Sequence, residues 1–141
     1  KINSKEIILI DDYGHHPIEI QSNINAYKEE YPKKKVCMIF QPHRYSRTAQ
    51  LFDDFVKVLT KTDSLILLDI YSASEKPIRG INSRTIAETI KQNGHKDVTY
   101  LKDHDEVINL IKNKKDYVDI VVTQGAGSIS KVCESIKDKW K

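Results

Sequence analysis

Two polar segments carry the side chains of this sequence that are best suited to chemistry. Residues 11–17 read DDYGHHP and residues 41–47 read QPHRYSR, and each segment follows an apolar run. Aspartate after a strand can accept a hydrogen bond from a ribose hydroxyl or hold a metal, and histidine can act as a base or a ligand near neutral pH. A polar turn that caps a helix beginning at Pro17 also explains the first segment, and spacing alone does not decide between these interpretations.

The second segment contains two arginines three residues apart in a chain that otherwise prefers lysine. Only four of the 23 Lys and Arg residues are arginines, and two of them are Arg44 and Arg47. The planar guanidinium group grips a carboxylate or a phosphate through two parallel hydrogen bonds, which lysine cannot do. If Ser46 caps a helix, Arg47 lies at its start, where a bound anion would also meet free backbone N–H groups. An ordinary pair of surface arginines is the alternative.

Other candidate features are weaker. A zinc site drawn from His15, His16, His43 and the aspartates needs three or four convergent ligands, and no metal motif is matched, so we expect no bound metal. Residues 123–128 (TQGAGS) lack the third glycine of the dinucleotide fingerprint, which favours tight packing of the turn over phosphate contact. After the third apolar run, Tyr71 is a candidate wall of a cleft, and Glu75 is interpreted as a solvated loop charge.

Apolar runs and amphipathic stretches alternate along the whole chain and predict the elements that position these side chains. Strands are expected at residues 7–10, 36–40, 64–70, 98–101 and 118–122. Helices are expected from Pro17, over 52–59, from about Ser83 to a stop at Gly94, after Asp103, and over 129–140, where Trp140 is expected to pack. This alternation predicts an α/β fold, a doubly wound, mostly parallel sheet of five to six strands with helices on both faces.

The carboxyl ends of parallel strands share one edge of a sheet, so distant polar segments can converge there. We expect one cleft at this edge, lined by Asp12, Tyr13, His15, Arg44 and Arg47, with residues 125–128 as further candidates. The order of the strands stays open, and one of them could run antiparallel.

Composition limits the class of protein. The 141 residues, 39% hydrophobic and 30% charged, predict one globular domain over residues 1–141. No apolar run approaches the ~20 residues of a membrane span. The net charge of +3 is dispersed without a stripe of interleaved aromatics, which argues against nucleic acid as a partner. Cys37 and Cys133 lie in apolar runs, which indicates buried free thiols in a reducing cytosol.

Five stretches resemble, in order and spacing, the C-terminal domain of the Mur ligases, and most closely of those that add L-alanine. They are DDYGHHP at 11–17, FQPHRYSRT at 40–48, LFDDF at 51–55, LDIY at 68–71 leading to Glu75, Pro77 and Ile78, and GAGSI at 125–129. The first two motifs are specific, and the glycine turn by itself is not. The resemblance spans essentially the whole chain.

This resemblance implies a Rossmann-like lid domain of a three-domain, cytoplasmic bacterial enzyme of peptidoglycan synthesis. The N-terminal domain would bind the uridine nucleotide, and the central domain would carry the ATP phosphate loop and the Mg²⁺ ligands. ATP would convert the carboxylate of UDP-N-acetylmuramate to an acyl phosphate, which the amine of L-alanine attacks. No Gly-x-x-x-x-Gly-Lys-Ser/Thr segment occurs in this sequence. Residues 1–141 alone are therefore expected to be inactive.

The resemblance also implies roles for five residues. Arg44 and Arg47 match positions that hold the carboxylate of L-alanine, and Tyr13 and His15 match positions beside the incoming amino acid. Asp12 matches a position that contacts the ATP ribose. We add the hypothesis that His15 accepts the proton that the ammonium group must lose before attack, which would make His15 catalytic.

Two alternatives stay open. A related ligase attaches a preformed tripeptide to the same muramyl nucleotide, but its family tends to have alanine in place of Gly14 and to lack the His-Arg-Tyr-x-Arg pattern. A stand-alone, non-catalytic nucleotide-binding module is the alternative from another class, and the missing phosphate loop is its best support.

Overall fold

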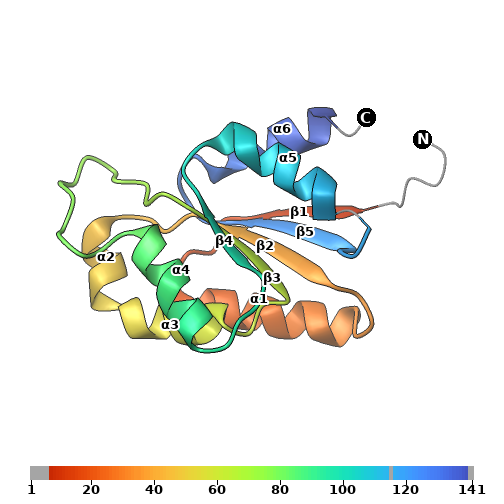
Figure 1. The fold of residues 1–141 in the computed structure, drawn as a ribbon, viewed down its shortest axis with the longest axis horizontal. Helices are drawn as coiled ribbons and strands as arrows, with labels where there is room; N and C mark the ends of the chain where they lie inside the picture. Colours follow the sequence, from red (N-terminus) through yellow and green to blue (C-terminus); the bar gives the residue numbers. More distant parts are fainter. Residues whose placement is uncertain (1–6, 115, 140–141) are drawn as a thin grey trace.

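A five-stranded parallel sheet forms the centre of the molecule (Figure 1). The computed structural model describes residues 7–114 and 116–139, so the predicted packing of Trp140 lies outside the described residues. The strands are β1 (Ile8–Asp12), β2 (Val36–Phe40), β3 (Ser64–Leu68), β4 (Val98–Leu101) and β5 (Ile120–Gln124), in the order β1-β5-β2-β3-β4. All neighbouring strands pair in parallel, which confirms the predicted fold and leaves no antiparallel strand in this sheet.

Helices cover both faces of the sheet (Figure 1). They are α1 (Pro17–Glu30), α2 (Tyr45–Gln50), α3 (Phe52–Leu59), α4 (Ser83–Gln92), α5 (His104–Lys114) and α6 (Ile129–Lys139). Helices α1, α3 and α4 share a hydrophobic core with one face, and α5 and α6 share a second core with the other. No helix in the described part of the chain is long and apolar enough to cross a membrane.

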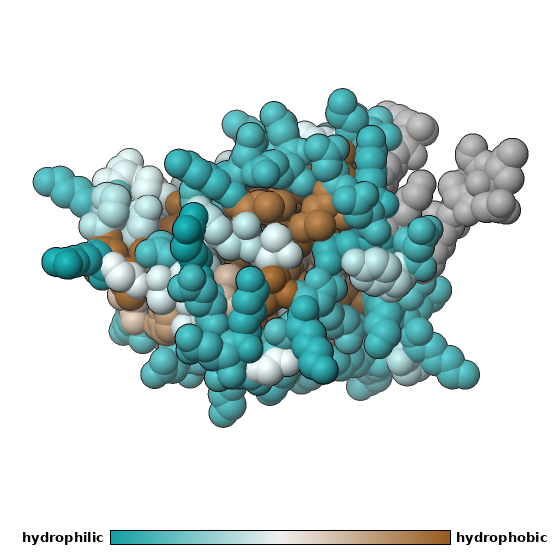
Figure 2. All heavy atoms as spheres, in the orientation of Figure 1, coloured by the Kyte–Doolittle hydropathy of each residue, from teal (hydrophilic) through white to brown (hydrophobic). Residues whose placement is uncertain are grey.

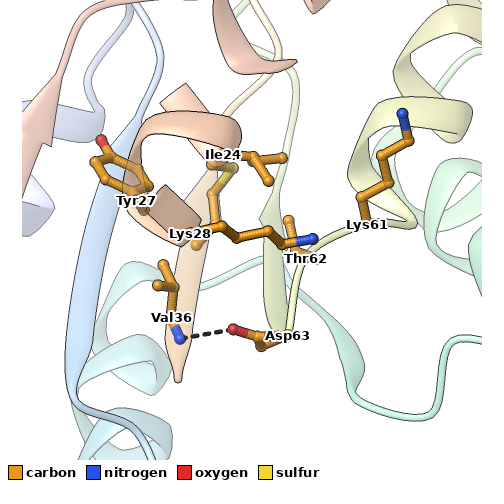
Figure 3. A pocket seen from close by; sticks show the side chains of 8 residues that line it. Ile24, Tyr27, Lys28, Val36, Lys61, Thr62 and Asp63 are labelled. Carbon is orange, nitrogen blue, oxygen red and sulfur yellow. Dashed lines mark hydrogen bonds between the residues drawn. The ribbon is translucent and has the colours of Figure 1, made fainter. Parts of the chain in front are cut away.

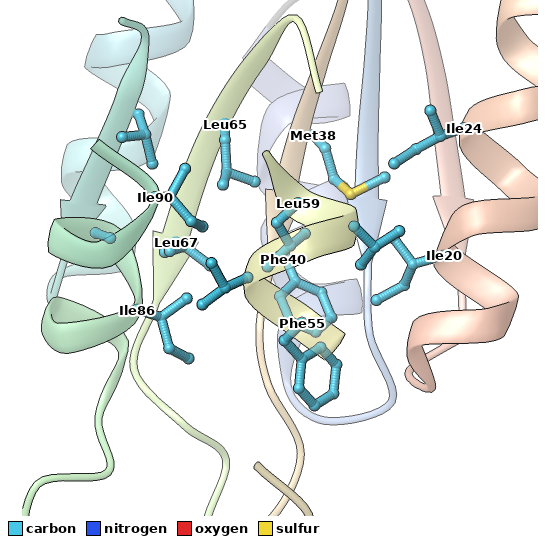
Figure 4. Close-up of a cluster of buried hydrophobic side chains, with 14 residues drawn as sticks. Ile20, Ile24, Met38, Phe40, Phe55, Leu59, Leu65, Leu67, Ile86 and Ile90 are labelled. Carbon is cyan, nitrogen blue, oxygen red and sulfur yellow. The ribbon is translucent and has the colours of Figure 1, made fainter. Parts of the chain in front are cut away.

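The alternation of side chains along each strand builds the two cores. Successive residues of β2 point to opposite faces, so Met38 and Phe40 join the first core while Cys37 and Ile39 join the second. Figure 4 shows the first core, where the rings of Phe40 and Phe55 lie 5.6 Å apart between β2 and α3. Burying one such ring contributes about 1.5–3 kcal/mol relative to leaving it exposed. Both cysteines are buried and free, as predicted.

Several boundaries differ from the sequence-based expectation. β3 ends at Leu68 instead of residue 70, and β5 covers Ile120–Gln124 instead of 118–122. β1 continues through Asp12, because residues 8–12 pair with residues 120–124 of β5 and Thr123 Oγ1 donates to Asp11 Oδ1 at 2.7 Å. The helix after β2 is divided into α2 and α3 at Leu51, and it begins after Arg44, not after a Ser46 cap. The expected cap was wrong because Ser46 already lies inside α2.

The connections create the recess that a doubly wound sheet offers to ligands. The chain leaves β1 and β2 toward the face covered by α1 and α3, whereas it leaves β5, which lies between them, toward α6 on the other face. Neighbouring strands whose connections diverge in this way open a crevice beyond their carboxyl ends. This carboxyl edge lies at the left of Figure 1. The face of the molecule seen in Figure 2 is mainly hydrophilic, with apolar side chains near its centre.

Candidate functional site

Four loops meet at the carboxyl edge of the sheet, and each follows the end of a strand. The loop after β1 is fastened to β5 through Gln124, a side chain with no exposed surface. Gln124 Nε2 donates to the carbonyl oxygen of Gly14 at 2.6 Å and to Asp12 Oδ1 at 3.2 Å, and its Oε1 accepts from Asn23 at 3.3 Å. Asp12 Oδ1 also accepts the N–H of Gly14 at 2.8 Å. These bonds fix the direction of the Asp12 carboxylate.

Gly14 lies in the tightest part of this loop. A Cβ atom on Gly14 would stand 3.0 Å from Asp12 Oδ1, 3.0 Å from Gln124 Nε2 and 3.2 Å from the Cβ of Glu19. Contacts this short require the neighbours to shift. A larger residue at this position would therefore require small shifts of the Asp12 and Gln124 side chains.

The two histidines of this loop have different tasks. His16 is the N-cap of α1, where its Nδ1 accepts the N–H of Ile18 at 3.1 Å. Glu19 Oε1 accepts the N–H groups of His16 and His15, each at 3.0 Å, and these bonds hold the pKa of Glu19 below its usual range. The helix-capping interpretation is therefore correct for His16, whereas the His15 ring turns toward the neighbouring loop and lies 5.6 Å from the ring of His43.

The arginine loop, residues 42–47, follows β2 and continues the strand pairing beyond the sheet. Tyr71 donates its N–H to the carbonyl of Pro42 at 2.8 Å, and Arg44 donates its N–H to the carbonyl of Tyr71 at 2.8 Å. Arg44 has φ = +72°, a left-handed conformation that costs a non-glycine residue about 1 kcal/mol or more. Arg44 is exposed and Arg47 is half-buried in the first turn of α2.

His43 is packed on the ring of Tyr71, with centroids 5.5 Å apart and planes 14° from parallel. Its Nδ1 is buried and has no hydrogen-bond partner. Burial, together with the charges of His15, Arg44 and Arg47, lowers the pKa of His43 below its usual value. His43 is therefore a neutral ring at pH 7, placed between the two loops that carry His15 and the arginines.

Glu75 lies on a solvent-exposed loop, as expected, and it also binds Ser46, which the sequence did not indicate. Its Oε1 accepts the N–H of Ser46 at 3.0 Å, and its Oε2 accepts the Ser46 hydroxyl at 2.5 Å. The hydroxyl bond is the main cause that lowers the pKa of Glu75. An anion does sit at the start of the arginine helix, as its chemistry predicted, but the anion belongs to the protein.

The glycine turn after β5 packs against the other loops. A Cβ atom on Gly127 would lie 2.6 Å from Tyr71 Cγ, and one on Gly125 would lie 2.7 Å from the carbonyl oxygen of Gln41. Gly125 also has φ = +142°. Gln41, 4% exposed, donates from Nε2 to Ser128 Oγ at 3.2 Å. Tight packing, as predicted, accounts for both glycines.

The surface cavity beside Asp12 does not extend to the two arginines. A cavity of about 580 Å³ is lined by residues 11–14 and by the side of α1 that carries Ile18 and Asn23. Arg44 and Arg47 do not line it, so the single cleft expected from the sequence is instead an open edge with a hollow on the Asp12 side. The recess in Figure 3, beside Tyr27 and Asp63 at the opposite edge of the sheet, measures about 10 Å³, room for no more than one water molecule.

The structure therefore brings the predicted site residues to one edge of the sheet. Asp12 ends β1, and Tyr13 and His15 follow it in the loop. Arg44 precedes α2 and Arg47 lies in its first turn, and the His15–His43 contact joins the two segments. Within residues 7–114 and 116–139, no three His, Cys, Asp or Glu side chains are arranged to hold a metal ion. Sequence reasoning assigned no role to the buried amides of Gln41 and Gln124, although a glutamine directly after an apolar strand is a signal for such a role.

Comparisons with known proteins bear on the fold as a whole. A family model described as Mur ligase, glutamate ligase domain, matches residues 1–127. The UDP-N-acetylmuramate–alanine ligase MurC from Thermotoga maritima is 25% identical, with a TM-score of 0.72 over 94% of this chain and 26% of that chain. The chain thus spans about a quarter of the length of that ligase.

Two further structures share the fold at lower identity. A murein peptide ligase from Psychrobacter arcticus is 16% identical, with a TM-score of 0.73 over 96% of this chain and 28% of that chain. A bifunctional folylpolyglutamate synthase/dihydrofolate synthase from Yersinia pestis, in complex with AMPPNP and Mn, is 14% identical, with a TM-score of 0.62 over 99% of this chain and 30% of that chain.

Proposed function

Since the chain belongs to the Mur ligase family, as its glutamate ligase domain, we propose that it is the amino-acid-binding domain of a ligase that joins L-alanine to UDP-N-acetylmuramate at the expense of ATP. Its partners in the reaction are then the N-terminal and central domains of the same enzyme. A cytoplasmic, bacterial setting follows from the same proposal.

One observation carries the choice of an amino acid as the ligand. Arg44 and Arg47 stand three residues apart at the start of α2, and the His15 ring approaches the same loop through its 5.6 Å contact with His43. A free amino acid presents a carboxylate and an ammonium group a few bonds apart. Two guanidinium groups suit the carboxylate, and an imidazole suits the proton of the ammonium group.

The geometry of His15 supports its role as proton acceptor. Its Nδ1 lies 3.3 Å from the carbonyl oxygen of Tyr13. A carbonyl only accepts hydrogen bonds, so this contact places the imidazole proton on Nδ1 and leaves the lone pair on Nε2. Nε2 can then take a proton from the ammonium group, which exposes the nitrogen lone pair for attack. Neutral His43 adds no charge that would repel the ammonium group.

The Asp12 side of the site suits the ribose of ATP. The Asp12 carboxylate, directed by Gly14 and Gln124, faces a hollow of about 580 Å³ and can accept from ribose hydroxyls. Following the resemblance, we assign the phosphates and Mg²⁺ to the central domain of the enzyme. Bound ATP supplies the phosphoryl group that activates the muramyl carboxylate. This chain contributes orientation of the amino acid and closure of the site.

The test is the exchange of Arg44 for lysine in the intact ligase that contains this chain. Arg44→Lys keeps the charge and removes the bidentate grip, so the KM for L-alanine should rise about tenfold or more, while the KM for ATP should change less than about twofold. Arg79→Lys, in an exposed loop, is the matched control. Equal changes in both KM values would contradict the assignment of Arg44 to the amino-acid carboxylate.

The tripeptide ligase is the second candidate, and the packing around Gly14 argues against it. Alanine, which that family tends to have at this position, would meet three atoms at 3.0–3.2 Å in the loop formed here. Assays of the intact enzyme with L-alanine and with tripeptide separate the two candidates.

Calorimetry on the 141-residue chain tests the third candidate. A stand-alone module binds a nucleotide tightly by itself, whereas a ligase domain that supplies only a ribose contact binds ATP weakly or not at all.

A further inference from the structure

The first part of the loop that follows β3, residues 71–75, is bound to the arginine loop. Backbone hydrogen bonds of 2.8 Å join Tyr71 to Pro42 and Arg44 to Tyr71, and His43 and Tyr71 form a parallel bridge. The stacking of His43 on Tyr71 adds a side-chain contact to the same seam. The position of the arginine loop is therefore set by residues 71–75 as well as by its own sequence.

Glu75 closes the far end of this seam. Its two carboxylate oxygens take the N–H and the hydroxyl of Ser46, at 3.0 and 2.5 Å. Ser46 lies between Arg44 and Arg47 in the sequence and in the first turn of α2. Hydrogen bonds to an ionised acceptor are about twice as strong as neutral ones. The Arg44 charge also acts on Glu75.

Backbone strain is concentrated in the same two loops. Among the described residues, the non-glycine positions with positive φ are Arg44 (+72°), Ala73 (+49°) and Ser74 (+73°). Each such conformation costs about 1–3 kcal/mol and persists only where surrounding contacts enforce it. Backbone bonds of Arg44 to Tyr71 and of Glu75 to Ser72 hold one side of this region, and the bonds of Ser46 to Glu75 hold the other.

We infer that Glu75 is a positioning residue, which through Ser46 holds Arg44 and Arg47 in the arrangement that receives the carboxylate of the amino acid. This inference rests on the proposed function and adds a residue to it. Glu75 is not placed to receive the amino-acid carboxylate itself, because two carboxylates repel each other. Its charge partly balances the arginines and leaves the pair net positive for the incoming anion.

The main test replaces Glu75 by glutamine in the intact ligase. Glu75→Gln removes the charge and replaces the carboxylate oxygen that accepts the Ser46 hydroxyl by an amide NH2 that can only donate. Both contacts to Ser46 become neutral and weaker, so the KM for L-alanine should rise about fivefold, while kcat and the KM for ATP stay within about twofold. Ser46→Ala keeps the Glu75 charge and the backbone bond, and should raise the same KM about twofold. Glu88→Gln, an exposed carboxylate on α4, is the matched control and should change nothing.

A double-mutant cycle distinguishes positioning from general stabilisation. If Glu75 acts through Arg44, then Glu75→Gln should raise the KM for L-alanine by less than about twofold in an Arg44→Lys background. An unchanged KM in the single variant, with only a lower melting temperature, would mean a purely structural role. A lower KM would mean that Glu75 competes with the substrate for the arginines. Either result overturns the inference.

Hydrogen exchange on the 141-residue chain separates this inference from the proposed function. The Ser46 amide should exchange at least about tenfold faster in Glu75→Gln than in the unchanged chain, because its acceptor is weakened. If the exchange rate changes but Arg44→Lys leaves the KM for L-alanine unaltered, the proposed function fails while the contact stands. Unchanged exchange overturns the positioning role itself.

Discussion

The two edges of the sheet use carboxylates in different ways. At the amino edge, where the strands begin, each carboxylate fastens a turn: Asp63 accepts the N–H of Val36 at 3.0 Å, and Asp97 pairs with Lys114 Nζ at 2.6 Å. At the carboxyl edge, Asp12 and Glu75 fix loops that also carry the exposed side chains of Tyr13 and Arg44. The carboxylates of the amino edge stabilise the fold, and those of the carboxyl edge fix the loops of the candidate site.

Backbone strain and exposed apolar side chains are also distributed unequally between the two edges of the sheet. The non-glycine residues with positive φ among the described residues all lie in the loops of the carboxyl edge. Four of the five exposed large hydrophobic side chains in the described chain also follow strands there: Tyr13, Ile18, Tyr71 and Ile78. Strained backbone conformations persist only where surrounding contacts enforce them. Strained residues and exposed apolar side chains both cluster at binding sites. The comparison predicts that variants at the amino edge change stability alone, and variants at the carboxyl edge also change substrate binding.

The largest loss of stability is expected at the amino edge. Lys114 is only 3% exposed, and Asp97→Ala leaves its ammonium group buried without this partner. Because Asp97 is itself 34% exposed, the cost should fall below that of a fully buried pair, at about 2–3 kcal/mol. Urea unfolding of the 141-residue chain measures it, with Glu88→Ala as the control. A loss under about 0.5 kcal/mol, or an altered KM in the intact ligase, would break the comparison.

A smaller loss of stability is expected from Gly127→Ala at the carboxyl edge. The new Cβ atom would stand 2.6 Å from Tyr71 Cγ and 2.8 Å from Gln41 Oε1, so Tyr71 must move, at a cost of about 1–2 kcal/mol. Because Tyr71 supports His43, the KM for L-alanine in the intact ligase should rise as well. Gly14→Ala, with its contacts of 3.0–3.2 Å, is the milder comparison. A Gly127→Ala enzyme with reduced stability and an unchanged KM would count against the coupling of Tyr71 to the site.

The smallest expected effect is a pH dependence that arises from His43. Burial, His15, Arg44 and Arg47 lower the pKa of His43, so the unfolded chain binds its proton more readily than the folded one. The stability contributed by the neutral ring is therefore complete above the unfolded pKa of about 6.5 and declines as the pH falls below it. His43→Gln should flatten the urea-unfolding profile between pH 7 and pH 5. The pKa of Glu75 is lowered, so the stability that its ionised form contributes is lost only below about pH 4.5, outside the pH range of the His43 effect.

Much of the fold was predictable because it depends on local pattern. Buried parallel strands appear as continuous apolar runs, and the expected ranges 36–40 and 98–101 agree with β2 and β4. Strand ends were less certain, since Asp11 and Asp12 belong to β1 through their pairing with β5, a contact about 110 residues away. Polar residue type suggested a loop there, and the distant strand decided otherwise.

For the candidate site, too, the residues were predictable and the contacts that support them were not. Residue type and resemblance selected Asp12, Tyr13, His15, Arg44 and Arg47. All of them lie at the carboxyl edge, Asp12 as the last residue of β1 and Arg47 in the first turn of α2, and their roles stay predictions. The supporting contacts were not predictable. Glutamate after a strand has the same composition whether it is solvated or bonded to Ser46, and no local pattern shows that Gln124 reaches the carbonyl of Gly14.

The sequence by itself determined the alternation of strands and helices and the chemical types gathered after each strand, because both follow from apolar periodicity and side-chain chemistry along a single segment. Only the tertiary structure decided which polar groups meet. The position of β5 between β1 and β2 brings Gln124 to Asp12, and the seam between the loops after β2 and β3 brings Glu75 to Ser46. Those encounters depend on strand order and loop conformation, which residues distant in the sequence set together.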